Sequence, residues 1–412
     1  MKRKLTYRTL WTLLVGTLLM TSCIEDFVAD IDEKDEQLLV VEGSIYSNSL
    51  CTFYLSSTQK VGGEYYWDDV GLGGEYGVSS LHAPRKNSFN VYNAEVSVQG
   101  SDGTSFPCEN NPYHSGYVGV AYQVNVGTLR RGVKYWLQVK VDGLTYESEP
   151  QEPIFAFPID SLSFAQERED LEVDILVSTA PSETGEPQYT RWEYEEWWEI
   201  YTPWTAFMEY DPITDKIIGV TAMKHHGWAN DSSKSYILAS SETFKDNRLQ
   251  QYRLYSIGHT DNRLQTCYYT RVKEYAISKA EYEYENLRNR QSSDMGGIFT
   301  PQPSELPSNI RCLEEDRKAI GFVGVRGSVA TCEMYIKKGQ VKYFPLRTPY
   351  TISEDLVKEK TWNELYRSGY QVLTYESYAN GKAYVQWCPV WCIDCRNSFW
   401  KCSLEKPSFW RE

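Results

Sequence analysis

The chain has 412 residues, of which 56 are acidic and 42 basic, and its formal net charge is −14. So acidic a chain is repelled by the phosphates of nucleic acids and by anionic lipid headgroups, which argues against binding to either surface through charge. Its length suffices for two or three domains, and its 32 Tyr and 13 Trp residues favour β-strands.

Residues 1–22 have the pattern of a secretory leader. Four basic residues precede an apolar stretch over residues 10–20, and the small residues Thr21 and Ser22 come before Cys23. The apolar stretch is shorter than the roughly 20 residues that a membrane span needs. The ending resembles a bacterial lipobox, in which the cysteine becomes the fatty-acylated (palmitate-bearing) first residue. An ordinary secretory signal with a chance cysteine is the alternative.

Residues 23–36 are predicted to form an acidic tether between the lipid and the folded protein. Without the leader, which holds four of the 42 basic residues and none of the 56 acidic ones, 38 basic residues face 56 acidic ones. Acidic residues directly after the cysteine resemble the surface-export signal of Bacteroidetes lipoproteins. We therefore expect a lipid-anchored protein of the outer membrane that is exposed at the cell surface and binds no nucleic acid.

Residues 37–152 are predicted to form an immunoglobulin-like or fibronectin-like β-sandwich. The turn residues Asp142 and Gly143 join two of its strands. The expected strands cover residues 38–45, 51–57, 94–99, 104–108, 117–126, 135–141 and 144–148.

A long Gly- and Tyr-rich segment over residues 61–90 interrupts these strands, and segments of this length are often functional. Aromatic side chains on adaptable backbone suit protein recognition. The partner-binding residues predicted in this segment are Tyr65, Tyr66, Trp67 and Tyr76.

Residues 153–412 are predicted to form a larger antiparallel β domain with two or more short helices. Three prolines between residues 150 and 158 mark the boundary. Capping-box patterns begin helices at Ser278 and Thr361, and an Asn-Gly pair at 380–381 indicates a hairpin.

The aromatic segment over residues 191–204 reads as a strand with alternating faces. Its pattern assigns Trp192 and Trp198 to the core. Trp197 and Tyr201 share the acidic face with several glutamates, and are therefore further candidates for partner binding.

Nine cysteines besides Cys23 indicate disulfides in an oxidising compartment. Cys51 and Cys108 lie in the same predicted sandwich and are the first candidate pair. The remaining candidates are Cys312 and a C-terminal cluster formed by Cys388, Cys392, Cys395 and Cys402. We expect Cys312 to bond one member of this cluster and so tie the C-terminal tail to the second domain. Zinc binding and thioredoxin-like redox chemistry are alternatives for the cluster, and the connectivity stays open.

The sequence shows no catalytic set, and we predict neither a catalytic residue, a metal site nor a cofactor. It contains no HExxH motif, no G-x-S-x-G elbow and no phosphate-binding loop with lysine. Glu193, Glu195 and Glu196 could act as the paired carboxylates of a glycoside hydrolase, but a solvated strand face explains them without catalysis.

Several stretches in a fixed order resemble one known family. They are LLVVEGSI at 38–45, NAEVSVQGSDGTSF at 93–106, TYESEP at 145–150, IDSLSF at 159–164, AISKAEYEYENL at 276–287, PSELPSNIRC at 303–312, CIDCR at 392–396 and KPSFW at 406–410. Together they resemble the Bacteroidetes outer-membrane lipoprotein family catalogued as domain of unknown function 4249. The resemblance covers nearly the whole mature chain and implies no catalytic residues. Members are often encoded beside TonB-dependent outer-membrane receptors, which implies an accessory role in uptake.

We therefore expect a non-enzymatic binding or accessory subunit that acts with a TonB-dependent receptor in nutrient uptake, with a ligand that the sequence does not identify. A structural or adhesive cell-surface protein is the alternative. A glycan hydrolase is a third hypothesis.

Overall fold

The computed structural model describes residues 38–58, 90–111, 120–182, 184–293, 306–314, 316–344, 360–377, 383–397 and 402–411. The fold is mainly β, with several antiparallel sheets and two α-helices in this part of the chain, and the predicted fold class is confirmed. The leader, the acidic tether and the segment over residues 59–89 lie outside the described residues.

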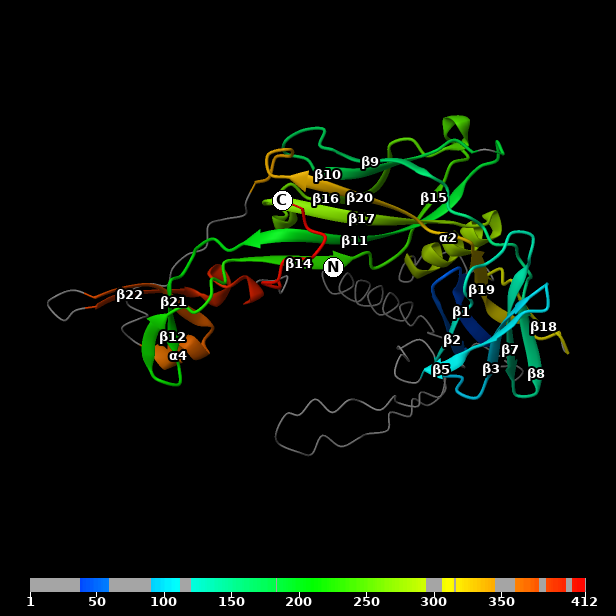
Figure 1. Ribbon diagram of the computed structural model, residues 1–412, viewed down its shortest axis with the longest axis horizontal. Coiled ribbons are helices and arrows are strands. Elements are labelled where there is room, and N and C mark those ends of the chain that lie inside the picture. Colours follow the sequence, from blue (N-terminus) through cyan, green and yellow to red (C-terminus); the bar gives the residue numbers. More distant parts are fainter. Residues whose placement is uncertain are drawn as a thin grey trace, which may run out of the picture. The chain divides into compact units, whose positions relative to one another are not determined.

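The sandwich consists of two five-stranded sheets (Figure 1). The first has the order β19-β1-β2-β6-β5, with bounds β19 Ala319–Arg326, β1 Leu39–Tyr46, β2 Leu50–Ser57, β6 Val120–Asn125 and β5 Glu109–Asn111. The second has the order β18-β8-β7-β3-β4, with bounds β18 Ile310–Cys312, β8 Leu144–Ser148, β7 Tyr135–Val141, β3 Glu95–Gly100 and β4 Ser105–Pro107. Alternate residues of both sheets, among them Val41, Phe53 and Leu137, pack into one core. The Asp142-Gly143 turn joins β7 and β8 with positive φ at both residues, as such a hairpin requires.

The sandwich is not a continuous segment of the chain, which corrects the predicted boundary of 37–152. β18 and β19 come from residues 310–326, which the sequence pattern assigned to the second domain, yet they pair with β8 and β1. The pairing of β1 with β19 is parallel, and Leu39 lies opposite Ala319. Parallel strands need a long crossover connection, so no local pattern could show that β1 finds its neighbour there.

Two further sheets enclose two hydrophobic clusters, and one of these also contains Cys395 and Cys402 of the C-terminal segment. One has the order β16-β10-β9, with bounds β16 Tyr252–Ile257, β10 Val173–Thr179 and β9 Ile159–Ala165. The other has the order β14-β11-β17-β20 with β15 also on β11, and its bounds are β14 His226–Ser232, β11 Tyr189–Tyr201, β17 Cys267–Ala276, β20 Ala330–Lys337 and β15 Ile237–Ser240. Trp192 and Trp198 are completely buried in these clusters, so their predicted place in the core is confirmed.

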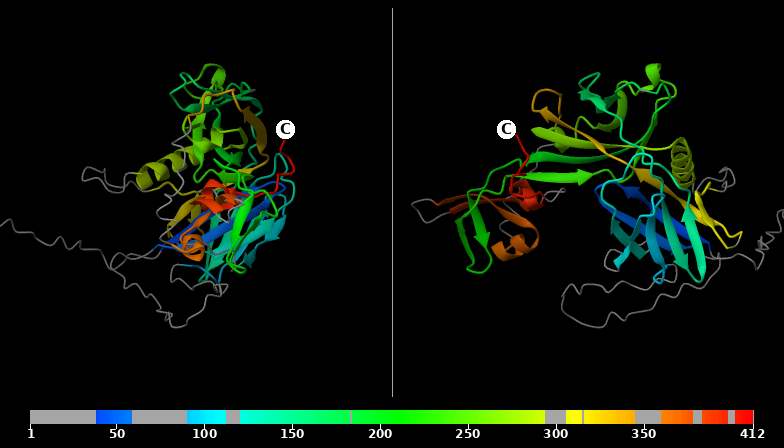
Figure 2. Two further views of the ribbon diagram at one scale, coloured as in Figure 1. Left: turned by 90° about the vertical axis from the view of Figure 1, so that its left-hand side faces the viewer. Right: turned by 45° about the vertical axis from the view of Figure 1, so that its right-hand side comes forward.

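The longer helix, α2 (Lys279–Ser293), contacts β11, β15 and β19 (Figure 2). Only half of its predicted capping box forms: the Glu281 backbone N–H donates to Ser278 Oγ at 3.1 Å, but the Glu281 carboxylate turns inward to the buried Arg326. Its Oε2 lies 3.1 Å from Arg326 Nη1. This ion pair joins α2 to the sandwich strand β19.

A small β–α unit combines residues 208–219 with residues 362–389. Its elements are β12 Met208–Asp211, β13 Lys216–Gly219, α4 Trp362–Arg367, β21 Tyr370–Ser377 and β22 Ala383–Pro389. They enclose a cluster of Tyr210, Leu365, Val372 and Trp387. The capping box predicted at Thr361 is complete, and β21 pairs with β22 as the predicted hairpin requires, although its turn at 380–381 lies outside the described residues.

Among the described residues there are also four 3₁₀ turns: η2 Lys245–Asn247, η3 Asn262–Leu264, η4 Val390–Cys392 and η5 Cys395–Asn397. Within the residues that the structure describes, no helix has both the length and the apolar character needed to cross a membrane.

Candidate functional site

Strand β11 directs successive side chains to opposite faces of its sheet. Arg191, Glu193 and Glu195 share one face, and the buried tryptophans share the other. The prediction placed Glu196 with the exposed glutamates, and this is wrong. Glu196 belongs to the core face, is only 2% exposed, and receives hydrogen bonds from Arg263 Nη1 at 2.8 and 3.0 Å. Burial raises the pKa of Glu196, and the nearby arginine opposes that shift.

A pocket opens beside β11 at the point where neither β14 nor β15 is paired with it. β14 pairs with residues 195–201 of β11 and β15 with residues 189–192, both antiparallel. The four residues 233–236 between them therefore face only Glu193 and Tyr194, and they bulge away from the strand. The Ser233 backbone N–H donates to Tyr194 O at 2.9 Å, and the Tyr194 N–H donates to Ser233 Oγ at 3.2 Å.

The pocket has a volume of about 500 Å³. Its lining is polar or aromatic and comes from β11, the end of β14 and the following loop, β17 and α2. The lining residues are Glu193, Tyr194, Glu195, Ser232, Ser233, Lys234, Ser235, Tyr236, Lys273, Arg288 and Asn289.

Charges on the floor of the pocket are paired between strands. Lys273 of β17 lies opposite Glu193 in register, and its Nζ donates to Glu195 Oε1 at 2.5 Å. Farther along the same face, Arg271 Nε donates to Glu333 Oε1 at 2.9 Å. Arg288 of α2 pairs with Glu285, with 2.9 Å between its Nη2 and the carboxylate.

A buried arginine supports one wall of the pocket. Arg191 is only 4% exposed, and its guanidinium carbon lies 3.9 Å from the centre of the Tyr236 ring and 5.0 Å from that of Tyr275. Its Nη2 donates to Tyr46 Oη at 2.6 Å and to Glu193 Oε1 at 3.3 Å. Desolvation raises the pKa of Tyr236 and Arg191 opposes the rise, so the phenol is neutral at pH 7 and can donate a hydrogen bond. The Tyr236 side chain is thus held in place from behind while the residue stays 40% exposed.

The aromatic residues predicted to bind a partner do not gather at this pocket. Trp197 is half-buried, with its ring centre 4.9 Å from that of Phe409 and 5.5 Å from that of Tyr269. The chain's own C-terminal segment therefore covers the Trp197 ring. Tyr201 is 37% exposed and stacks on His226 at 4.2 Å.

The other predicted site residues, Cys23, Tyr65, Tyr66, Trp67 and Tyr76, lie outside the described residues. Tyr236, Lys273 and Arg288 line the pocket but were not predicted from the sequence. For Lys273 the available signal was the alternation of Arg271 and Lys273 around the apolar Val272, which marks a solvated face on β17.

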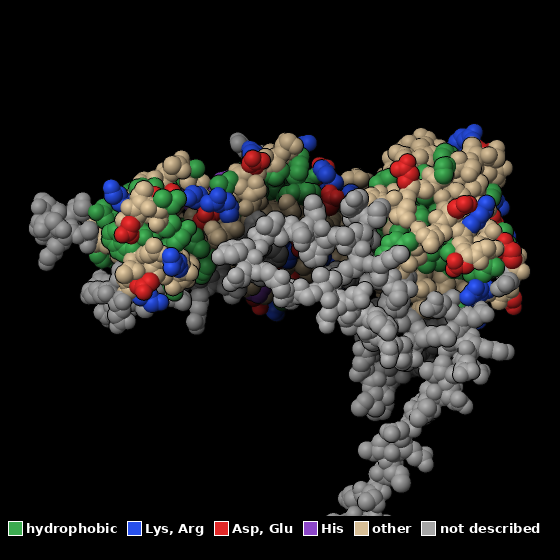
Figure 3. All heavy atoms as spheres, turned by 90° about the horizontal axis from the view of Figure 1, so that it is seen from below, with side chains coloured by type: hydrophobic (Ala, Val, Ile, Leu, Met, Phe, Trp, Pro, Cys, Tyr) green, Lys and Arg blue, Asp and Glu red, His purple; other side chains and the backbone are tan. Residues whose placement is uncertain are grey.

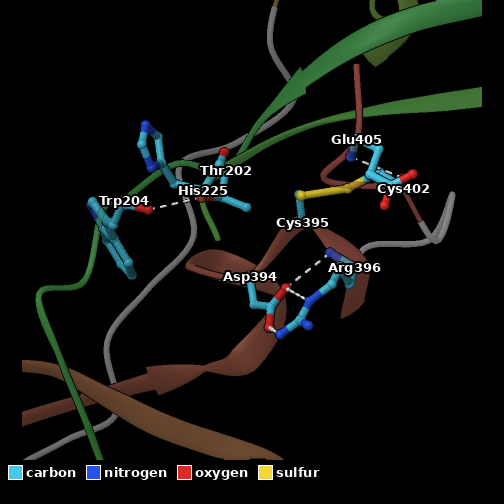
Figure 4. The surroundings of a disulfide bond; sticks show 9 residues. Thr202, Trp204, His225, Asp394, Cys395, Arg396, Cys402 and Glu405 are labelled. Atoms are coloured by element: carbon cyan, nitrogen blue, oxygen red, sulfur yellow. Dashed lines mark hydrogen bonds and ion pairs between the residues drawn. A yellow bond between two sulfur atoms is a disulfide. The ribbon is translucent and has the colours of Figure 1, made fainter. Parts of the chain in front are cut away.

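The C-terminal cysteine cluster contains one disulfide, between Cys395 and Cys402 (Figure 4). It lies beside the Asp394–Arg396 ion pair and against Gly227 of β14. Beside it in sequence, the thiols of Cys388 and Cys392 are unbonded and buried in one small cluster.

Burial raises the pKa of Cys388 to about 12 and that of Cys392 to about 11, and the proximity of Cys392 adds to the shift at Cys388. Both groups are therefore protonated at pH 7.

The other predicted cysteine pairs are not bonded. Cys51 and Cys108 are free thiols of the same sandwich core, and burial together with the nearby Cys51 raises the pKa of Cys108 to about 12. Cys312 lies on β18 and pairs with Tyr146 of β8. The predicted bond from Cys312 to the C-terminal cluster is absent, because this residue belongs to the sandwich. In the described part of the chain, no group of three or more His, Cys, Asp and Glu residues is arranged to hold a metal ion.

A second surface feature is apolar and lies on the small β–α unit, at the left of Figure 3. Large hydrophobic side chains are exposed along this unit and its flanking segments: Phe207 by 64%, Ile213 by 92%, Met223 by 47%, Tyr366 by 40% and Trp391 by 45%. Apolar side chains that gather on one surface commonly mark a site of protein or membrane interaction.

A family model described as "Domain of unknown function (DUF4249)" matches residues 24–331, most of the chain, and confirms the resemblance seen in the sequence. No curated protein matches the chain.

Proposed function

This chain belongs to the DUF4249 family, and from that premise we propose that it is a lipid-anchored protein of the outer membrane or cell surface. It binds a ligand without chemical turnover and serves as an accessory subunit of a TonB-dependent receptor in nutrient uptake.

The observation that carries the binding role is the polar pocket beside β11. Its volume of about 500 Å³ falls within the usual range for small-molecule sites, about 300–1,000 Å³. Both carboxylates on its floor are engaged by cations of the protein itself, Glu195 by Lys273 and Glu193 by Arg191. Carboxylates held in this way shape a site and orient a ligand, which favours binding over acid–base catalysis.

The leader and Cys23 support the lipid anchor. The family match begins at residue 24, directly after this cysteine, and acylation by more than one chain gives firm membrane attachment. The test replaces Cys23 with Ala in the full chain, with Cys332→Ala as a control that removes a half-buried free thiol. We expect the masses of the wild-type and C332A chains to include the acyl groups and that of C23A to lack them. A wild-type chain that carries no acyl mass at Cys23 contradicts the anchor.

The exposed apolar side chains of the small β–α unit support a protein partner. Affinity purification of the tagged full chain from solubilised outer membranes is expected to recover a TonB-dependent receptor. We expect Phe207→Ser with Trp391→Ser to lower that recovery roughly tenfold, equivalent to about 1.4 kcal/mol of binding free energy. The control is Leu313→Ser, because Leu313 is 49% exposed but lies beside β18 of the sandwich.

Absence of any receptor among the recovered proteins contradicts the accessory role. Recovery of host or neighbour-cell material in its place favours the adhesive alternative.

A further inference from the structure

We propose that the pocket beside β11 binds a neutral saccharide. This inference rests on the proposed binding function, because it names the ligand class of the same site.

The ionic groups of the pocket already have partners within the protein. Lys273 pairs with Glu195 at 2.5 Å, and Arg288 pairs with Glu285 at 2.9 Å. Lys234, at the rim, pairs with Asp231. A ligand with a net charge must displace one of these partners or lie beside a like charge, and both are unfavourable. A neutral ligand leaves every pair intact.

The hydrogen-bonding groups of the pocket suit hydroxyl groups. Carboxylate oxygens of Glu193 and Glu195 accept hydrogen bonds, while the Lys273 ammonium and the Asn289 amide donate them. A hydroxyl both donates and accepts, so it can lie beside an ion pair, donate to the carboxylate and accept from the ammonium without separating the two. Hydrogen bonds to ionised groups are also the stronger kind.

Tyr236 provides an apolar surface for one face of a sugar ring. The Arg191 guanidinium lies 3.9 Å from its ring centre and fixes the ring, and the residue remains 40% exposed. The C–H groups on one face of a pyranose pack against such a ring, while its hydroxyls lie around the edge. A fixed aromatic ring loses little conformational entropy on binding.

A peptide ligand fits less well. Among the lining residues that the structure describes there is no Val, Leu, Ile, Met or Phe. An apolar peptide side chain would therefore be buried among charged groups and hydroxyls, which do not favour its transfer from water.

The test measures the full chain, lipid anchor included, on an array of neutral oligosaccharides, uronic-acid or sialylated oligosaccharides, and short peptides. The detergent must carry no sugar headgroup. We expect retention on at least one neutral oligosaccharide, with an affinity that changes less than about twofold between low and high salt. Tyr236→Ala should weaken this binding at least tenfold. The matched control is Tyr384→Ala, because Tyr384 is 39% exposed on β22, away from the pocket lining.

Each alternative outcome has a distinct meaning. Binding to acidic glycans or peptides alone overturns the inference and leaves the proposed binding function standing. Failure to bind any neutral probe overturns the inference. Equal binding by wild type and Y236A shows that the saccharide lies elsewhere and overturns the site assignment. Co-purification of a receptor is measured separately and depends on none of these results.

Discussion

The carboxyl group of Glu274 is predicted to make the protein less stable as the pH rises, and Glu274→Gln should remove that dependence. Glu274 lies on β17 and is completely buried. Its Oε2 accepts a hydrogen bond from the Phe157 backbone N–H at 3.1 Å, whereas Oε1 lies buried without a hydrogen-bond partner. Burial raises its pKa to about 8, although the Phe157 N–H and Arg326 both favour the ionised form.

The sign follows from proton binding. An unfolded chain releases the Glu274 proton near its ordinary pKa of 4.5, while the folded protein keeps it up to about pH 8. The folded state therefore binds more protons between these values, and the stabilisation present below pH 4.5 is lost as the pH rises to 8. At about 1.36 kcal/mol per pH unit, this group alone lowers the free energy of unfolding by roughly 3 kcal/mol between pH 5.5 and 8.

The assay is urea unfolding of the full chain, followed by tryptophan fluorescence at pH 5.5 and 8, for wild type and E274Q. The difference between the two proteins cancels the other titrating groups. Gln keeps the acceptor for Phe157 but cannot ionise, so E274Q should gain roughly 3 kcal/mol on wild type between the two pH values. Glu95→Gln, at an exposed position of β3, should track wild type. Parallel pH dependences for wild type and E274Q would refute the reasoning.

Two further predictions concern the C-terminal segment. A Cβ at Gly227 would lie 2.5 Å from Ser403 O. G227A should therefore break the pairing of β14 with the C-terminal segment and abolish the protection of that segment from hydrogen exchange. The control G219A should leave this protection unchanged, because a Cβ at Gly219 meets nothing within 4 Å. Since Cys388 and Cys392 are buried side by side, mild oxidation of the purified protein should link them to each other, and peptide mapping that finds either one bonded to a different cysteine contradicts this pairing.

Elements with local signals were predictable from the sequence. The alternation along β11 correctly placed Trp192 and Trp198 in the core, and the Asp142-Gly143 pair correctly marked the turn between β7 and β8. The capping box at Thr361 formed at an exposed helix end, where the Glu364 carboxylate accepts a hydrogen bond from the Thr361 backbone N–H at 2.7 Å. These features depend on neighbours within a few residues.

Features that depend on distant residues were not predictable in the same way. The Glu281 carboxylate does not complete the capping box, because it forms a buried ion pair with Arg326 of β19. Trp197 was assigned to a binding surface, but Phe409 of the C-terminal segment packs against its ring. The candidate pocket likewise combines residues 193–195, 232–236, 273 and 288–289, which no single stretch of sequence brings together.

The parallel pairing of β1 with β19 has a consequence for biosynthesis. The ribosome makes the chain from its N-terminal end, so Leu39 emerges long before its neighbour Ala319. During that interval the first strand has an open edge that a second nascent chain could occupy. The sandwich can be completed only after its last strand has arrived, and a chaperone that shields the open edge until then would raise the yield of correctly folded molecules.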